Sequence, residues 1–220
     1  MKSITANPPT SSSPPTVPAV VSAPRRIKPV ELAAWVEMQL PRITRRWLRE
    51  VQNRYDPGTR GVNGLLEDFL GLLASFLPGM LGPYRQQVEA LWTRASELFG
   101  AVAAKRGLAA GEAIEEFQIL REVVISLLYQ DPPLGGRAPV SLREILRLNR
   151  AIDMGVTHAS VGHTDALFFS LFEGSGIPDA PPTSELVEEL RRELTAIREE
   201  LRQILGDLPG AWAVEEGKEI

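Results

Sequence analysis

The two histidines are the side chains best suited to metal binding or proton transfer near neutral pH. His158 and His163 are five residues apart in a segment with helical periodicity, which turns them about 140° away from each other. Two histidines share a metal ion on a helix when they are three or four residues apart. We therefore interpret both as surface or boundary residues, with Asp153 as a local polar contact for His158 and Asp165 for His163.

Glu116 and Arg121 could form an acid and base pair, but solvated charges are commoner. Both residues lie beside the apolar stripe of their predicted helix, so we expect a boundary contact with a neighbouring helix. The chain has no cysteine, no serine in a nucleophile elbow and no glycine-rich phosphate loop. The sequence therefore predicts no catalytic site, no metal site and no cofactor, and thus a protein that is not an enzyme.

Four arginines gather on one side of the first predicted helix, at Arg42, Arg45, Arg46 and Arg49. A solvated face is the simplest interpretation, and an acidic protein partner is the second. The formal net charge of −4 and the pI of about 5.4 argue against nucleic acid or an anionic membrane as the partner.

Small residues recur along the helix predicted over 141–172, at Gly155, Ala159, Gly162 and Ala166. Each helical glycine costs about 1 kcal/mol relative to alanine, so packing or function should offset the loss. Close approach of another helix is the favoured interpretation. A ligand slot beside Trp92 or Trp47 is the alternative.

Apolar residues recur every three or four positions through most of the chain, which predicts helices and no strands. Pro41 should kink or split the first helix, and Pro78 and Gly79 should end the second. Ser141 and Glu144 predict a capping box at the start of the fifth. The predicted helices cover 30–55, 62–77, about 83–106, a segment that ends before 131, 141–172 and 184–208.

The last predicted helix carries apolar residues at alternating intervals of three and four, a heptad pattern typical of coiled coils. This pattern predicts pairing with another chain as a homodimer or higher oligomer. Because three heptads are few, folding of the helix back onto its own bundle is left open. The seam consists of Val187, Leu190, Leu194, Ile197, Leu201, Ile204 and Leu208.

The expected organisation is an all-α bundle of about five helices between less ordered segments. Residues 1–26 are rich in Pro and Ser and predict a disordered tail, followed by a bundle domain over 27–174. A linker over 175–183, the coiled-coil helix over 184–208 and a tail over 209–220 complete the chain. The apolar segment 65–81 is interrupted by charges and a proline, which predicts a buried helix, no membrane span and a cytoplasmic protein.

The segment from Glu97 to Leu128 resembles the N-terminal domain family of RsbT co-antagonists, the RsbR-type regulators of bacterial stress signalling. The resemblance lies in a helix that ends in a basic glycine turn at Arg106 and Gly107, followed by Glu-Phe, two residues and Leu-Arg from Glu116 to Arg121. Family members tend to carry a histidine ahead of the basic turn, where this chain has Phe99.

The resemblance implies a helical sensory domain that dimerises and passes a conformational change to a protein partner. The bundle and heptad pattern favour the same class, a regulatory protein-binding module without an active site. A small-molecule sensor with a ligand between bundle helices is the alternative.

Overall fold

The computed structural model describes residues 25–54, 63–172 and 184–206. Within these ranges it contains six α-helices, one short 3-10 helix and no strand, which confirms the all-α class. Most of the predicted tail over 1–26, the linker over 175–183 and the tail over 209–220 lie outside the described residues. The elements are α1 (Pro29–Arg54), α2 (Asn63–Leu81), α3 (Arg85–Lys105), α4 (Ala110–Gln130), η2 (Pro133–Gly136), α5 (Leu142–Phe172) and α6 (Ser184–Gly206).

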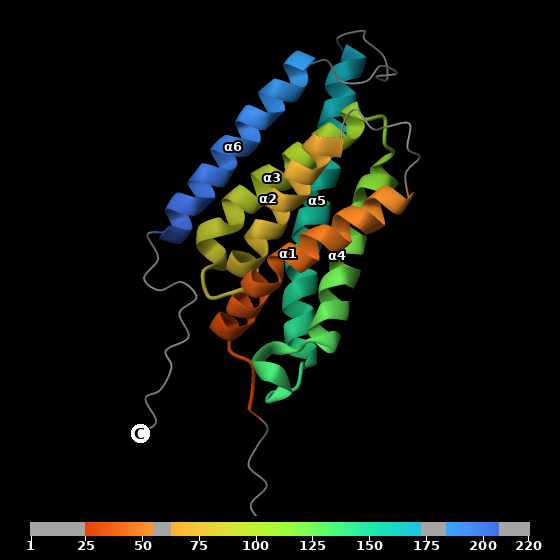
Figure 1. Ribbon diagram of the computed structural model, residues 1–220. Coiled ribbons are helices and arrows are strands. Elements are labelled where there is room, and N and C mark those ends of the chain that lie inside the picture. The colour runs from red at the N-terminus through yellow and green to blue at the C-terminus, as the bar shows by residue number, and fades with distance from the viewer. Residues whose placement is uncertain (1–24, 55–62, 173–183, 207–220) are drawn as a thin grey trace, which may run out of the picture.

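The longest helix, α5, extends along the whole bundle (Figure 1). At 1.5 Å per residue its 31 residues measure about 46 Å. Its most extensive contact is with α3, and α4 packs on it as well. The helix α1 contacts α2 and α4, while α6 packs on α2 and α3. One end of the bundle holds the beginning of α1, the beginning of α5 and the turn between α2 and α3 (Figure 1).

Pro41 lies inside α1, which continues as one helix from Pro29 to Arg54. The sequence predicted a kink or a split near Leu40; the split is wrong, and the kink stays a prediction. A proline removes one backbone hydrogen bond from a helix, and the cost falls when the unpaired carbonyl faces water. Pro41 is exposed, whereas Val36 and Ile43 on either side of it are fully buried, so packing of the flanking turns holds the helix together.

The helix α2 passes through Pro78 and ends at Leu81, so the predicted end at Pro78 and Gly79 is wrong by one turn. Met80 and Leu81 are each 1% exposed. Burying two such side chains contributes about 1.5–3 kcal/mol each, more than the loss of one hydrogen bond. The segment Gly64–Leu81 could cross a bilayer by length and composition alone, but 72% of it is buried inside the bundle, as in the core helix of a globular protein.

The start of α5 follows from its capping residues. The backbone N–H of Ser141 donates to Oε2 of Glu144 at 2.8 Å, and the N–H of Arg143 donates to Oγ of Ser141 at 3.3 Å. These contacts pair backbone donors that a helix start leaves free. The predicted start at this capping box is confirmed, and it fixes the register of all later α5 residues.

The helix α6 lies on its own bundle. Leu190, Leu194, Ile197 and Leu201 are buried against the core, while Val187 and Ile204 are partly exposed and Leu208 lies outside the described residues. Arg198 donates from Nη2 to the carbonyl of Asp68 in α2 at 3.3 Å, and Arg94 in α3 pairs with Glu200 at 3.4 Å. This is the fold-back that the heptad pattern left open. Pairing between chains stays a prediction.

Candidate functional site

Glu116 is a fully buried carboxyl group in α4, with 0% of the residue exposed. Its Oε1 accepts from Nη1 and Nη2 of Arg106 at 3.4 Å each, and the Arg106 side chain is only 9% exposed. The other oxygen, Oε2, has no hydrogen-bond partner. Charge-assisted hydrogen bonds are usually about 2.7–2.9 Å long, so this long contact pairs the carboxyl group incompletely. The sequence interpretation of Glu116 as a boundary or solvated residue is wrong.

Burial raises the pKa of Glu116 from 4.5 to about 7. The Arg106 guanidinium opposes this shift by charge and by hydrogen bonding, and nearby Glu112 adds to it. Desolvation disfavours the ionised form of a carboxyl group, and two long hydrogen bonds from one cation offset only part of that cost. The bundle therefore contains an acid that exchanges its proton near neutral pH, next to the α3–α4 turn.

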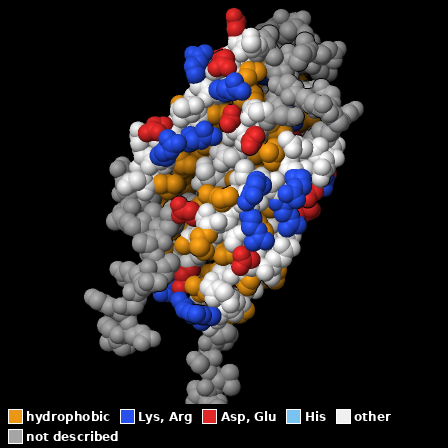
Figure 2. All heavy atoms as spheres, in the orientation of Figure 1, with side chains coloured by type: hydrophobic (Ala, Val, Ile, Leu, Met, Phe, Trp, Pro, Cys, Tyr) orange, Lys and Arg blue, Asp and Glu red, His pale blue; other side chains and the backbone are white. Residues whose placement is uncertain are grey.

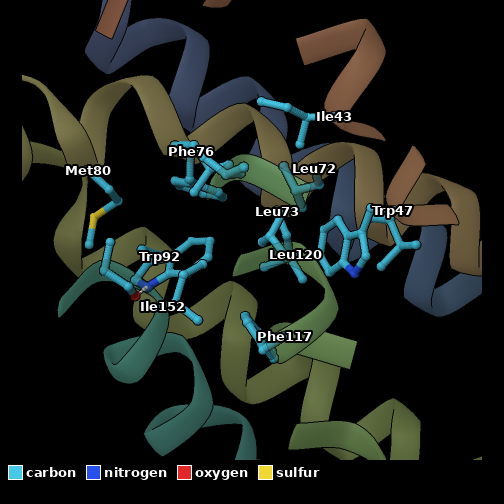
Figure 3. Close-up of a cluster of buried hydrophobic side chains, with 14 of the residues drawn as sticks. Ile43, Trp47, Leu72, Leu73, Phe76, Met80, Trp92, Phe117, Leu120 and Ile152 are labelled. Atoms are coloured by element: carbon cyan, nitrogen blue, oxygen red, sulfur yellow. Dashed lines mark hydrogen bonds between the residues drawn. The ribbon is translucent and has the colours of Figure 1, made fainter. Parts of the chain in front are cut away.

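Two tryptophans connect the helices around this acid. Nε1 of Trp47 donates to the carbonyl of Glu116 itself at 2.7 Å, which ties α1 to α4. Nε1 of Trp92 donates to the carbonyl of Ala151 at 3.1 Å, which ties α3 to α5. Both rings are fully buried in the hydrophobic cluster of Figure 3. Any movement of the α4 backbone at Glu116 therefore reaches α1 directly.

Phe117 lies at the centre of an aromatic cluster. Its ring centroid is 5.3 Å from that of Phe99, 6.1 Å from Trp92 and 6.5 Å from Trp47. The first two pairs meet edge to face, a favourable arrangement of aromatic quadrupoles. A Cβ atom at Gly155 of α5 would lie 2.7 Å from ring atoms of both Phe117 and Trp92. The ligand slot considered beside Trp92 is thus occupied by these rings.

The helices α3 and α5 touch backbone to backbone at two glycines. A Cβ atom at Gly100 would lie 1.8 Å from the carbonyl oxygen of Ala159, and one at Gly162 would lie 1.9 Å from that of Glu97. Only hydrogen fits at such distances. The small residues of α5 thus accommodate a close helix crossing, and only Ala166, at the end of the strip, is partly exposed.

The two histidines have other partners than the sequence suggested. Nδ1 of His158 lies 2.9 Å from Oε1 of Glu97 in α3, in place of the predicted contact with Asp153. Nε2 of His163 lies 2.8 Å from the carbonyl oxygen of Leu108, in place of Asp165. At 3% exposed, His163 belongs to the core and the boundary prediction is wrong. Across the described residues, no three His, Asp or Glu side chains are grouped so as to hold a metal ion.

Arg121 does not meet Glu116, although both were candidate site residues. It pairs with Asp153 of α5 at the surface. This is a contact between neighbouring helices, as the sequence predicted for Arg121. An exposed pair of this kind contributes about 0–1 kcal/mol, so we treat it as positioning α4 on α5.

The four arginines of α1 form a basic surface, which we call the α1 basic face, and Lys and Arg side chains gather over α1 in Figure 2. With Leu127 of α4 they line a small hollow of about 230 Å³. Arg42 is already engaged, because Nη1 lies 3.3 Å from Oδ2 of Asp131, and Nε of Arg45 donates to the carbonyl of Pro41 at 3.0 Å. The ion pair offsets the charge of Arg42, whereas the hydrogen bond to a neutral carbonyl leaves Arg45 positively charged.

The end of α5 exposes a group of large apolar side chains, which we call the α5 apolar end. Phe168 is 56% exposed and Phe172 is 74% exposed, and their ring centroids lie 4.5 Å apart. Phe169 and Leu171 are exposed as well. Sequence reasoning assigned this segment to a core helix and missed the surface. The signal was present, because the run FFSLF is apolar on several sides of a helix that ends there.

Comparisons with protein-family models, with curated proteins and with solved structures gave no match for this chain.

Proposed function

We propose that the chain is a non-enzymatic regulatory module that acts through helix packing and association with protein partners, as in RsbR-type stress signalling. The observation that carries this proposal is the α5 apolar end. Single exposed apolar residues are normal on protein surfaces, but contiguous apolar patches mark interaction sites. Three phenylalanines and one leucine within five residues make such a patch, at the end of the helix that extends along the whole bundle.

The contacts of α5 support a role in passing changes between the two ends of the bundle. The backbone contacts at Gly100 and Gly162 leave little room for sliding, so α3 and α5 should move as one body. Glu97 and Trp92 of α3 add polar contacts to this pair of helices. A shift at the beginning of α5 therefore reaches the apolar end through a rigid element.

Dimerisation through the α5 apolar end is the arrangement we favour. The heptad seam of α6 offers a second one, in which α6 leaves α2 and α3 and pairs with another copy. That exchange exposes four buried apolar side chains of α6 before it forms new contacts. The α5 apolar end needs no such rearrangement, because its side chains are already exposed.

Sedimentation velocity across a range of protein concentrations tests this proposal. Wild type should form a dimer, and the double variant Phe168→Ser, Phe172→Ser should sediment as a monomer with an unchanged helical spectrum. Met38→Ser is the matched control, because Met38 is 73% exposed on α1, away from the patch. Dimers of equal strength in wild type and the double variant would contradict the role of the α5 apolar end.

A further inference from the structure

A groove of about 840 Å³ lies at the end of the bundle opposite to the α5 apolar end. Its lining residues come from the start of α1, the α2–α3 turn and the first turns of α5. No acidic side chain lines this groove, although the chain as a whole has a net charge of −4. Its charged lining residues are four arginines, Arg85, Arg143, Arg147 and Arg150.

The positive charge of the groove is only partly compensated. Arg85 pairs with Glu89 at 3.0 Å, and Nη1 of Arg147 donates to the carbonyl of Leu81 at 2.9 Å. In the part of the chain that the structure describes, Arg143 and Arg150 form no ion pair. Burial, Arg143 and Arg85 lower the pKa of Arg147, while Glu144 opposes them. Neighbouring cations repel one another, and an anion that binds between them relieves this repulsion and lowers the electrostatic free energy.

Two exposed leucines stand beside these charges. Leu142 is 70% exposed and Leu146 is 44% exposed, and one helical turn separates them on α5. Arg143 and Arg147 follow each leucine by one position, so apolar and basic stripes run side by side. Such a surface is complementary to a segment with leucine-like residues on one side and carboxylates on the other.

We propose that this groove docks an acidic amphipathic segment of a partner protein. Sites for small molecules bury about 70–90% of the ligand surface. The exposed Leu142 leaves the rim of this groove open, so the groove favours an extended segment over a small molecule. Clusters of arginine recognise acidic motifs through paired hydrogen bonds to carboxylates, and an apolar helix face is read through residues spaced three or four apart. The occupant therefore presents glutamates to Arg143 and Arg150 and apolar side chains to Leu142 and Leu146.

Fluorescence anisotropy with the full chain tests the proposal. The probe is a short labelled peptide with leucines four residues apart and glutamates between them, compared with the same peptide carrying glutamine for glutamate. The acidic peptide should bind, and the glutamine peptide should bind at least about tenfold more weakly, the equivalent of about 1.4 kcal/mol. Binding should weaken as the salt rises from about 0.01 M to about 0.1 M, because screening shortens the range of the charges.

Charge reversal locates the site. The double variant Arg143→Glu, Arg150→Glu should abolish peptide binding. The control is the double variant Arg45→Glu, Arg49→Glu on the α1 basic face, which has the same net charge and should bind the peptide as wild type does. The proposal would be overturned if both variants lost peptide binding equally or if wild type did not bind the acidic peptide. It would also be overturned if inorganic phosphate, at the same concentration as the peptide, displaced the peptide fully. All four residues are exposed, and unchanged thermal melting confirms that both variants fold.

The inference rests on the proposed protein-binding function, but the two can fail separately. The charge-reversal variant should still dimerise, because the α5 apolar end begins at Phe168, about 27 Å along the helix from Arg150. If wild type binds the peptide and the Arg143→Glu, Arg150→Glu variant dimerises without binding it, the groove proposal is supported independently of the dimer. If wild type itself dimerises but does not bind the peptide, the groove proposal fails and the dimer proposal remains.

Discussion

Replacing Gly100 or Gly162 with alanine should destabilise the protein by about 3 kcal/mol, because the added methyl group meets a backbone carbonyl. The new Cβ would lie 1.8 Å from an oxygen of Ala159 in the first variant and 1.9 Å from that of Glu97 in the second. A backbone oxygen cannot turn aside as a side chain does, so α3 and α5 must separate. The separation also weakens the polar contact between His158 and Glu97. In a chain of this size, about 3 kcal/mol lowers the melting temperature by roughly 6–12 °C.

Gly71→Ala is the matched control for both variants. Gly71 lies inside α2, and a Cβ atom there meets nothing within 4 Å. Alanine is a better helix former than glycine by about 1 kcal/mol, so this variant should be as stable as wild type or more stable. Thermal and urea unfolding, followed by circular dichroism, measure all three. Wild-type stability in Gly100→Ala and Gly162→Ala would show that α3 and α5 do not touch backbone to backbone.

The free energy of unfolding should fall by about 3 kcal/mol as the pH rises from about 4.5 to about 7, because of Glu116. Its pKa is raised to about 7 in the folded chain, against 4.5 for the ordinary group. Between these two values the folded chain holds a proton that the unfolded chain has released, so unfolding becomes more favourable as the pH rises. Below about 4.5 both states hold the proton, and the stabilisation is complete. Above about 7 it is lost.

Urea unfolding at a series of pH values measures this dependence. Glu116→Gln has no titrating group at the position and should remove most of the slope. Glu115→Gln is its neighbour control, because Glu115 is exposed and pairs with Arg54 at the surface. It should keep the wild-type slope. The same slope in wild type and Glu116→Gln would mean that Glu116 is ionised across this range.

Periodicity predicted the helices because burial of one face repeats every three or four residues. The start of α5 was clear, since Ser141 and Glu144 pair backbone donors locally. The end of α2 was misjudged at Pro78, because a local rule about proline says nothing of the burial of Met80 and Leu81 that follows. Local capping signals were therefore better guides than local breaking signals.

The contacts of the candidate site could not be read from spacing. Arg106 lies in the turn after α3 and Glu116 lies ten residues later in α4, and only the geometry of this turn brings them together. The same holds for His158 and Glu97, which meet because α3 crosses α5 at two glycines. The spacing of small residues along α5 identified the side of this helix that packs closely. It did not identify the residues of α3 that lie against that side.

The heptad pattern of α6 shows the same limit. A seam with a period of 3.5 and an apolar stripe with a period of 3.6 diverge by only about 20° per heptad, so three heptads do not separate them. The pattern identified the apolar face through Leu194 and Ile197. It did not identify what covers that face, which in this chain is α2 and α3.

Distances between spin labels on two copies of the chain test the central claim, association through the α5 apolar end, most directly. Because the chain has no cysteine, Thr164→Cys and Ala196→Cys each supply a single labelling site, one on α5 just before the apolar end and one on the exposed side of α6. Pulsed electron resonance should give a defined distance between copies for both, with the shorter one at position 164. A shorter distance at position 196, or no dipolar signal at either position, would contradict the account.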